Sequence, residues 1–306
     1  MTTARRAGIC ALIAGLALAG CTSGSPEHGN QGQGESAGPS SAPSSAPSGA
    51  PSGAPGGSAG MSQVAEQLQA VFGPAVAPQQ DGSFGLDRWQ LVEPGPGGPA
   101  GPALRITYPQ GSVSPSASRR YHSPGGGMQV FLPVLGAPVD AEYLRYWVRF
   151  ADDFQFVKGG KLPGLYGGTE VSGGEQPDGT NGFSTRLMWR RQGAGEVYLY
   201  APGESGTSLG RGDWTWPRGR WLCVEQQVVL NTPGKDDGAV TVWLDGKQVY
   251  ADDQLMYRTV PGLRIDGLFF STFFGGDDPS WAPSADQHAD FSGFALSGRP
   301  LGCAAG

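Results

Sequence analysis

The sequence predicts an all-β fold, a jelly-roll sandwich of two antiparallel sheets with a concave binding face. Segments with strand-like composition recur from residue 144 to residue 296, and clusters of Gly, Pro, Asn and Asp separate them. Helical patterning is nearly absent, apart from a short segment at residues 61–73. Residues 61–306 are long enough for one large β domain and contain no internal linker, so we expect a single domain there.

The N-terminal residues predict export and membrane anchoring. Residues 1–20 contain two arginines, then an apolar run too short to span a bilayer, then small residues, as in a signal peptide. Cys21 follows directly, and "LALAGC" resembles the bacterial lipobox. We therefore expect Cys21 to be lipidated and to hold the protein on the extracytoplasmic side of the cell membrane. Ordinary secretion, with Cys21 merely near the cleavage point, is the alternative.

Residues 21–60 predict a disordered tether. After Cys21 they contain no Lys or Arg and almost no apolar side chains, and they are rich in Ser, Pro and Gly. Such a segment cannot bury enough surface to offset the entropy of ordering. We therefore expect a flexible connection between the lipidated cysteine and the domain at residues 61–306.

The charge of the chain excludes one class of partner. The formal net charge is −6. Because Arg5 and Arg6 of the signal segment offset Glu27 and Glu35 of the tether, the domain carries the same net charge. A nucleic-acid-binding domain is normally basic, which argues against that class. We expect a monomer. We also expect no organic cofactor, because no motif requires one.

Cys223 and Cys303 are the two cysteines of the expected domain. In an oxidising compartment two such cysteines are more often paired than free, so we expect a disulfide that ties the chain's end to a core strand. Two buried thiols are the alternative.

No transition metal is expected. Three aspartates in the acidic segment 275–291 offer oxygen ligands for Ca²⁺, but their spacing matches no EF-hand and a solvated loop is preferred: Asp277, Asp278 and Asp286.

The strand predicted at residues 144–150, "LRYWVRF", alternates in character. Successive side chains of a strand point to opposite faces of the sheet. Arg145, Trp147 and Arg149 therefore share one face, where an aromatic surface lies between two cations. We expect this face to bind substrate, and a solvated outer face with a partly covered Trp is the alternative.

Residues 182–190 and 196–201 predict a hairpin that carries chemistry. The period of two places Ser184 and Arg186 on one face of the first strand, and Tyr198 and Tyr200 on one face of the second. If Arg186 pairs with Tyr198, Ser184 must pair with Tyr200, because antiparallel partners have a constant index sum. The four side chains then form one patch. The intervening "RQGAG" is a plausible loop.

The segment "KGGKLPGLYGG", residues 158–168, predicts a glycine-rich bend. Its glycines allow a tight path and the close approach of a polymer, and Pro163 stiffens the turn. We expect the bend to bring Lys158 or Lys161 over the hairpin patch. A structural bend with solvated lysines is the alternative. The remaining strands are expected at residues 221–230, 239–250, 265–274 and 289–296.

The patch contains cations and phenols, with no histidine and no close pair of carboxylates beside it. This combination suits β-elimination from a polymer of uronic acids. The C5 proton lies α to a carboxylate, and removing it builds charge that cations or hydrogen-bond donors must neutralise. A base takes the proton and an acid protonates the departing 4-oxygen. Lysine and tyrosine can fill these roles when their surroundings shift their pKa values.

The segments "FQFVKGGKLPGLYGG", "STRLMWR" and "VYLYAPG" resemble polysaccharide lyase family 14, which includes alginate lyases and related glucuronate-polymer lyases. The resemblance continues through "GRWLCVEQQVVLNTPG" and "STFFGGDDPSWAP". It implies a concanavalin-like jelly roll and an anionic polysaccharide substrate. It further implies Lys161 as the leading base, Tyr200 as the acid, and Tyr198 and Arg186 as groups that bind the substrate carboxylate or tune the tyrosines. Ser184 belongs to the same implied set.

The sequence leaves the base, the polymer and two alternative functions open. The proton can go to Lys161 or to a tyrosine, and the polymer is of the alginate or the glucuronan type. Lys158 and the segment "SRRYHSPGGG", with His122, are expected near the same groove. A non-catalytic carbohydrate-binding module is the alternative function, since aromatics and cations serve it equally. A glycoside hydrolase would need two inward carboxylates, and Glu196 is the one nearby candidate.

Overall fold

The computed structural model describes residues 66–303 except 74–78, 134 and 170. The expected signal peptide, Cys21 and the tether lie outside the described residues. The described residues belong to one compact unit. No helix in the described part of the chain is long and apolar enough to cross a membrane.

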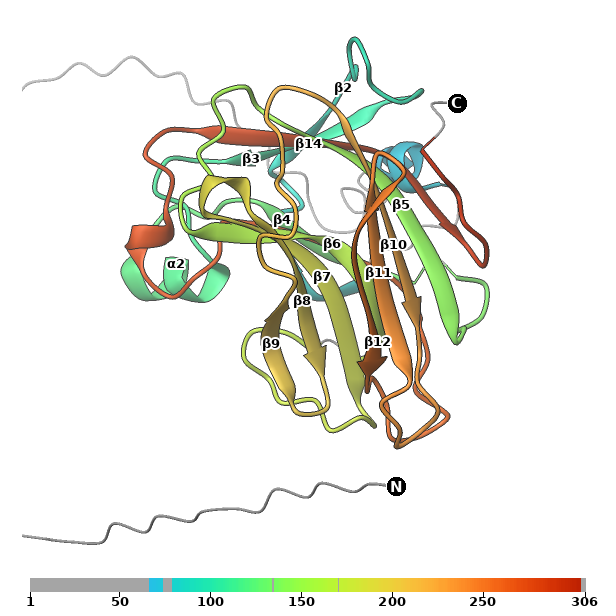
Figure 1. Ribbon diagram of the computed structural model, residues 1–306. Helices are drawn as coiled ribbons and strands as arrows, with labels where there is room; N and C mark the ends of the chain where they lie inside the picture. The colour runs from blue at the N-terminus through green and yellow to red at the C-terminus, as the bar shows by residue number, and fades with distance from the viewer. Residues whose placement is uncertain (1–65, 74–78, 134, 170, 304–306) are drawn as a thin grey trace, which may run out of the picture. The chain divides into compact units, whose positions relative to one another are not determined.

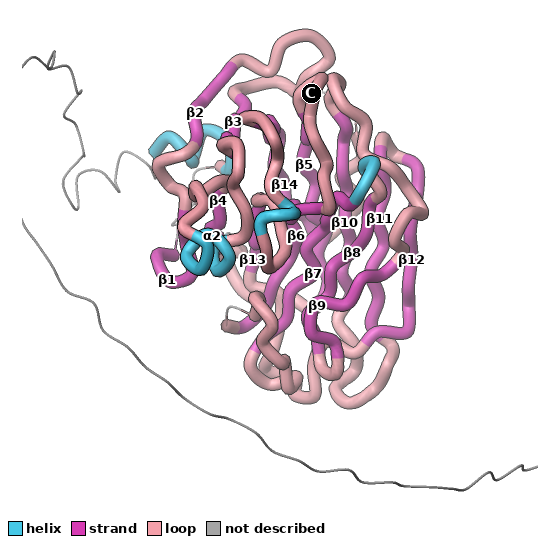
Figure 2. Tube along the Cα trace, turned by 90° about the vertical axis from the view of Figure 1, so that its left-hand side faces the viewer, coloured by secondary structure: helices cyan, strands magenta, loops and turns pink. Residues whose placement is uncertain are grey.

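Two seven-stranded antiparallel sheets make up the fold (Figures 1 and 2). We call the first the groove sheet; its strands, in spatial order, are β1 (Gln79–Phe84), β4 (Met128–Leu132), β13 (Gly267–Thr272), β6 (Gly159–Gly168), β7 (Gly182–Arg190), β8 (Gly195–Ala201) and β9 (Glu204–Leu209). We call the second the back sheet; its strands are β12 (Lys247–Leu255), β11 (Gly238–Leu244), β10 (Leu222–Val229), β5 (Ala141–Phe150), β14 (Gln287–Ser297), β3 (Ala103–Tyr108) and β2 (Trp89–Val92). The jelly-roll prediction is confirmed.

Short helical segments lie at the margins of the sheets. They are the helical residues 66–72, α2 (Pro115–Tyr121), η1 (Arg191–Gly193) and η2 (Pro279–Trp281). The helical expectation at residues 61–73 is thus met over its described part. The helix α2 and the strands β1 to β4 and β9 were not predicted, because these segments are short or lack a clear alternation of apolar and polar residues.

The core lies between the two sheets and is filled by alternate side chains of each strand. On the groove sheet Phe183, Leu187 and Trp189 point inward, as the period of two predicts. On the back sheet Leu144 and Tyr146 do the same. The other face of the groove sheet is therefore left free of the core and available for polar side chains.

The glycine-rich segment is a strand, which corrects the expectation of a bend. Residues 159–168 form β6 and pair with β7 along its length. Its glycines are required by close packing: a Cβ on Gly160 would lie 2.0 Å from the Trp189 ring, and one on Gly164 would lie 2.1 Å from the Thr185 carbonyl oxygen. Glycine in a strand interior often marks such an approach. Lys161 is thus carried by a rigid strand in the middle of the sheet.

Pro163 interrupts the ladder between β6 and β7, and a buried side chain repairs it. The register shifts between Leu162 and Gly164, since Pro has no N–H to donate. Gln226 of the back sheet reaches across the core, where it accepts a hydrogen bond from the Leu165 N–H (3.3 Å) and donates one to the Thr185 carbonyl (2.8 Å). These two hydrogen bonds satisfy the buried Leu165 N–H and the buried Thr185 carbonyl, and they link the two sheets behind the site.

The predicted disulfide is confirmed. Cys223 of β10 and Cys303 are joined, with their Cα atoms 5.8 Å apart. The preceding backbone is held as well, because the Leu301 and Gly302 N–H groups donate to the Glu225 carboxylate at 2.7 and 3.2 Å. The end of the described chain is therefore fastened to the outer face of the back sheet.

Candidate active site

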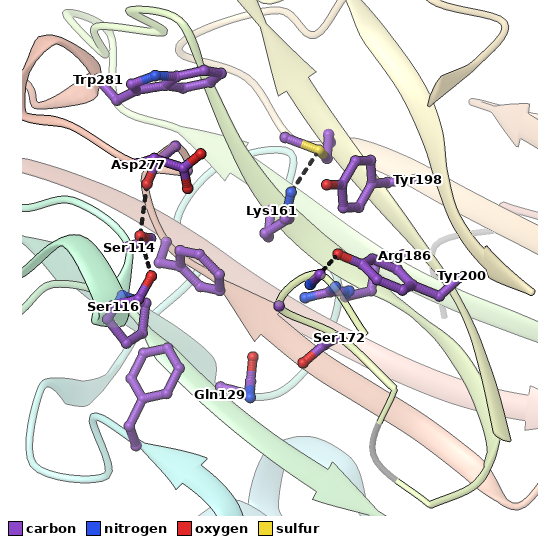
Figure 3. Close-up of a pocket in the computed structure, with 18 of the residues that line it drawn as sticks. Ser114, Ser116, Gln129, Lys161, Ser172, Arg186, Tyr198, Tyr200, Asp277 and Trp281 are labelled. Atoms are coloured by element: carbon purple, nitrogen blue, oxygen red, sulfur yellow. Dashed lines mark hydrogen bonds between the residues drawn. The ribbon is translucent and has the colours of Figure 1, made fainter. Parts of the chain in front are cut away.

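A cavity of about 770 Å³ opens on the outer face of the groove sheet. Its floor is formed by side chains of β6, β7 and β8. Residues of β1, β4, β9, α2, η2 and the adjoining loops surround this floor. Figure 3 shows Lys161, Arg186, Tyr198 and Tyr200 gathered on one side of the cavity, with Asp277 and Trp281 on the other. Residues from separate parts of the sequence thus meet around one open space.

The hairpin has the register that the sequence analysis considered. Arg186 pairs with Tyr198 and Ser184 pairs with Tyr200. The connecting loop contains the short helix η1, where Gln192 adopts a φ of 59° and Gly193 a φ of 79°. Arg186 and both tyrosines consequently project from neighbouring strands toward the cavity.

Lys161 is buried, with 9% of its surface exposed, and has no carboxylate in direct contact among the described residues. Its Nζ donates to Met188 Sδ at 3.0 Å and lies 3.4 Å from the centre of the Tyr198 ring. Burial lowers the pKa of Lys161 well below its ordinary value, and the nearby charges of Arg186 and Arg190 lower it further. Glu196 and Asp277 act in the opposite direction but do not reverse the effect. The surroundings therefore favour a neutral amine.

Arg186 is also buried, at 1% exposure, and two consecutive hydrogen bonds hold it in place. Its Nη1 donates to Ser271 Oγ at 3.2 Å, and Ser271 in turn donates to Gln129 Oε1 at 3.0 Å. The guanidinium lies 4.6 Å from the centre of the Phe269 ring and within 6 Å of both tyrosine rings, in the range of cation–π contacts. A planar cation is thus held in place at the cavity, ready to bind a carboxylate.

The two tyrosines lie across the cavity from Asp277 (Figure 3). Their ring centres are 5.6 Å apart, and the Tyr200 hydroxyl accepts a hydrogen bond from the Gly174 N–H at 3.0 Å. Burial raises the pKa of Tyr198 to about 12, and the neighbouring Tyr200 adds to the increase, although Arg186 and Arg190 oppose it. At neutral pH the Tyr198 phenol is therefore protonated and is a hydrogen-bond or proton donor.

Glu196 does not supply the carboxylate that a hydrolase would need. Its side chain is fully buried and is bonded through both oxygens. Oε1 accepts from Arg190 Nε at 2.8 Å and from Ser208 at 3.0 Å, and Oε2 accepts from Arg211 Nε at 2.6 Å. It is absent from the cavity lining. Its evident role is to hold Arg190, which does line the cavity, in place.

Three residues expected to bind substrate lie elsewhere. Arg145, Trp147 and Arg149 belong to β5 in the middle of the back sheet and line neither described cavity. Trp147 pairs with Cys223 and lies against Gly293, and Arg149 approaches Asp152 at 3.9 Å. The alternation correctly separated the two faces of this strand, but it could not show which sheet the strand would join.

Three other expected residues do not line the cavity. Ser184 is fully buried and donates to the Val171 carbonyl at 3.0 Å, which fastens the loop before Ser172 and Gly174. Lys158 donates to Ser280 of η2 and lies 5.8 Å from the Trp281 ring. His122 is exposed at the C-terminal end of α2, with a left-handed backbone. Only Lys161, Arg186, Tyr198 and Tyr200 of the expected set are brought together at the cavity.

The aspartates of the acidic segment have separate roles. Asp277 lines the cavity, whereas Asp278 caps η2 by accepting from the Ser280 N–H at 2.7 Å. Asp286 accepts from the Gln110 N–H at 2.8 Å. The described residues contain no cluster of three or more His, Cys, Asp or Glu side chains arranged to hold a metal ion.

Several lining residues were not recognised as functional from the sequence. Met188 and Arg190 share the face of Arg186, so the period of two placed them correctly without indicating a role. Trp281 belongs to the short helix η2, whose position the sequence does not reveal. Arg119 of α2, by contrast, lies in the segment "SRRYHSPGGG", which was expected near the groove, and it does line the cavity. Apart from Lys161, the charged residues that line the described cavity are three arginines and one carboxylate: Arg119, Arg186 and Arg190 against Asp277. The site is thus locally basic in an acidic protein.

A jelly roll with a lysine, an arginine and two tyrosines on an outer sheet face defines a polysaccharide lyase. The chain belongs to the polysaccharide lyase 14 family, whose sequence model matches residues 98–294. Comparison with curated proteins finds no match.

Solved structures support this assignment. The marine PL-14 alginate lyase from Aplysia kurodai is 33% identical, with a TM-score of 0.61 over 71% of this chain and 89% of that chain. Alginate lyase vAL-1 from Chlorella virus shares the fold, at 23% identity and a TM-score of 0.57, over 68% of this chain and 88% of that chain.

Proposed function

We propose that this protein cleaves a polyuronate of the alginate type by β-elimination, with Lys161 as the base. The observation that carries the proposal is the environment of Lys161, a buried amine beside a fixed guanidinium and the Tyr198 phenol, whose pKa is raised. The Aplysia kurodai enzyme that is 33% identical is an alginate lyase, which supports alginate as the first polymer to test.

The reaction follows from these positions. Arg186 pairs with the carboxylate of the sugar whose C5 proton is removed, and stabilises the charge that develops there. The neutral Lys161 amine takes the C5 proton. The electron pair of the C5–H bond forms the C4=C5 double bond as the bond from C4 to the glycosidic oxygen breaks. A tyrosine hydroxyl, Tyr200 in the arrangement that the family resemblance implies, donates its proton to the departing oxygen.

The pKa directions fit this division of roles. A base must be unprotonated before it reacts, and the lowered pKa of Lys161 makes the neutral amine accessible without strongly alkaline conditions. The raised pKa of Tyr198, about 12, makes its phenolate scarce and disfavours it as the base. Protons then return from the Lys161 ammonium to the tyrosine through solvent before the next turnover.

Ultraviolet absorbance tests this function. The full-length protein is incubated separately with alginate, polymannuronate, polyguluronate and glucuronan at neutral and alkaline pH. We expect absorbance to rise with alginate or one of its two homopolymers, because the product carries a double bond conjugated with its carboxylate. A rise with glucuronan alone would contradict alginate as the substrate. Binding of these polymers with no absorbance change would contradict a lyase and indicate a carbohydrate-binding module.

We further propose that the protein acts outside the cytoplasm, as a monomer held on the membrane by a lipid on Cys21. The support is the order of arginines, short apolar run, small residues and cysteine at the N-terminus. We expect a labelled fatty acid to be incorporated by the wild-type protein in a bacterial host and to be lost in Cys21→Ala. Equal labelling of both proteins would contradict the anchor.

A further inference from the structure

A second, smaller cavity adjoins the active site. Its volume is about 200 Å³, and it shares Phe84, Pro115 and Arg119 with the main cavity. The rest of its lining comes from Arg88, Val113, Ser118, Gly125 and Gly126. The two cavities therefore adjoin at Arg119, and two arginines line the smaller one, Arg88 and Arg119.

The wall that carries Arg119 is held firmly. Ser114 accepts the Ala117 N–H at 3.3 Å at the start of α2 and donates to the Gly276 carbonyl at 2.6 Å, which fastens the helix to the loop before η2. Val113 and Gly125 form an isolated parallel bridge across the base of the helix. The position of Arg119 is thus set by the fold even though its side chain is exposed.

Arg88 is held against the glycine run. A Cβ on Gly125 would lie 2.7 Å from its Nη2, so only glycine lets the guanidinium lie this close to the backbone. Its ion pair with Asp87 is long, at 3.8 Å, and that carboxylate is 82% exposed. Among the described residues, no carboxylate pairs with Arg119. Both guanidinium groups can therefore take an external anion.

We propose that the smaller cavity is an additional subsite for a uronate carboxylate of the polymer, with Arg119 as the cation at its entrance. The inference rests on the proposed function and extends it to sugars beyond those at the reacting bond. Guanidinium groups pair with carboxylates through two parallel hydrogen bonds. Because the chain's net charge is −6, attraction to a polyanion depends on such local cations.

The test compares long and short substrates. We measure kcat/KM of the wild type, Arg119→Ala and Arg120→Ala with two substrates, alginate polymer and an alginate tetrasaccharide. The absorbance of the unsaturated product reports the rate with both. Arg120 is the matched control, because it is the next residue of α2, is equally exposed and lines neither cavity. We expect Arg119→Ala to lower the ratio of polymer to tetrasaccharide kcat/KM by about fivefold, the size of a partly exposed charge pair.

The outcomes separate the two proposals. A ratio that falls in Arg119→Ala, is largely kept in Arg119→Lys and is unchanged in Arg120→Ala supports the subsite. An active wild type with the same ratio in Arg119→Ala and Arg120→Ala overturns the subsite and leaves the lyase function standing. A wild type that cleaves none of the polyuronates overturns the lyase function, and the subsite with it.

Discussion

Replacing Lys161 by alanine is expected to lower kcat by about 10²- to 10⁴-fold, the contribution of a positioned general base. In the proposed mechanism this amine takes the C5 proton, and the raised pKa of Tyr198 keeps that phenol from replacing it. The measurement is the initial rate of absorbance increase on alginate. Lys158→Ala is the matched control, because Lys158 lies on the same segment but outside the cavity lining, and it should retain nearly full activity.

The burial of Lys161 also affects the stability of the fold. The pKa of Lys161 is lowered in the folded state, so between that value and the ordinary 10.5 the unfolded chain binds more protons. This penalty is absent above pH 10.5, grows as pH falls and is complete below the folded-state pKa. Lys161→Met should therefore have a higher melting temperature than the wild type at neutral pH while being inactive. An unstable Lys161→Met would mean that the loss of activity reflects misfolding.

Replacing Arg186 by glutamine is expected to lower kcat by about 10²- to 10³-fold, as when one donor to a developing charge is removed. Arg186→Lys should recover part of the loss, because it keeps the charge without the planar pair of donors. Since Arg186 lowers the pKa of Lys161, its loss should also move the acid-side limb of the pH profile to higher pH. The measurement is kcat across pH on alginate.

Arg211→Gln is the control for this experiment. Arg211 pairs with buried Glu196 at 2.6 Å, but its side chain is half exposed and does not line the cavity. It should change stability more than the shape of the pH profile. If Arg186→Gln folds and keeps wild-type kcat, the carboxylate of the reacting sugar is not neutralised by Arg186, and the proposed division of roles is wrong.

Local patterning predicted much of the fold. The alternation in residues 182–201 predicted the face shared by Arg186, Tyr198 and Tyr200. The constant index sum tied the Ser184–Tyr200 pair to the Arg186–Tyr198 pair, which the structure contains. These features depend on neighbouring residues alone, which a sequence displays directly. The Cys223–Cys303 pair was found for a different reason, since the expected domain offers those two cysteines and no others.

What the sequence could not predict depends on contacts between distant segments. The glycines of β6 resemble those of a bend until Trp189 and Thr185 are seen to pack on them. The outward side chains of β5 resemble a binding face, because alternation does not show which sheet a strand joins. The environment of Lys161 is likewise a tertiary property, because Met188 and Tyr198 approach it from two other strands.

The most direct test of the central claim, that Lys161 is the base, is the pH dependence of kcat/KM for the wild type and Tyr198→Phe on alginate. Phenylalanine keeps the ring beneath the amine and removes the hydroxyl. The account predicts that both proteins have an acid-side limb with nearly the same midpoint, well below the ordinary lysine pKa of 10.5, because this limb reports deprotonation of Lys161. A wild type whose activity rises only toward pH 12, with that rise lost in Tyr198→Phe, would contradict the account and make Tyr198 the base.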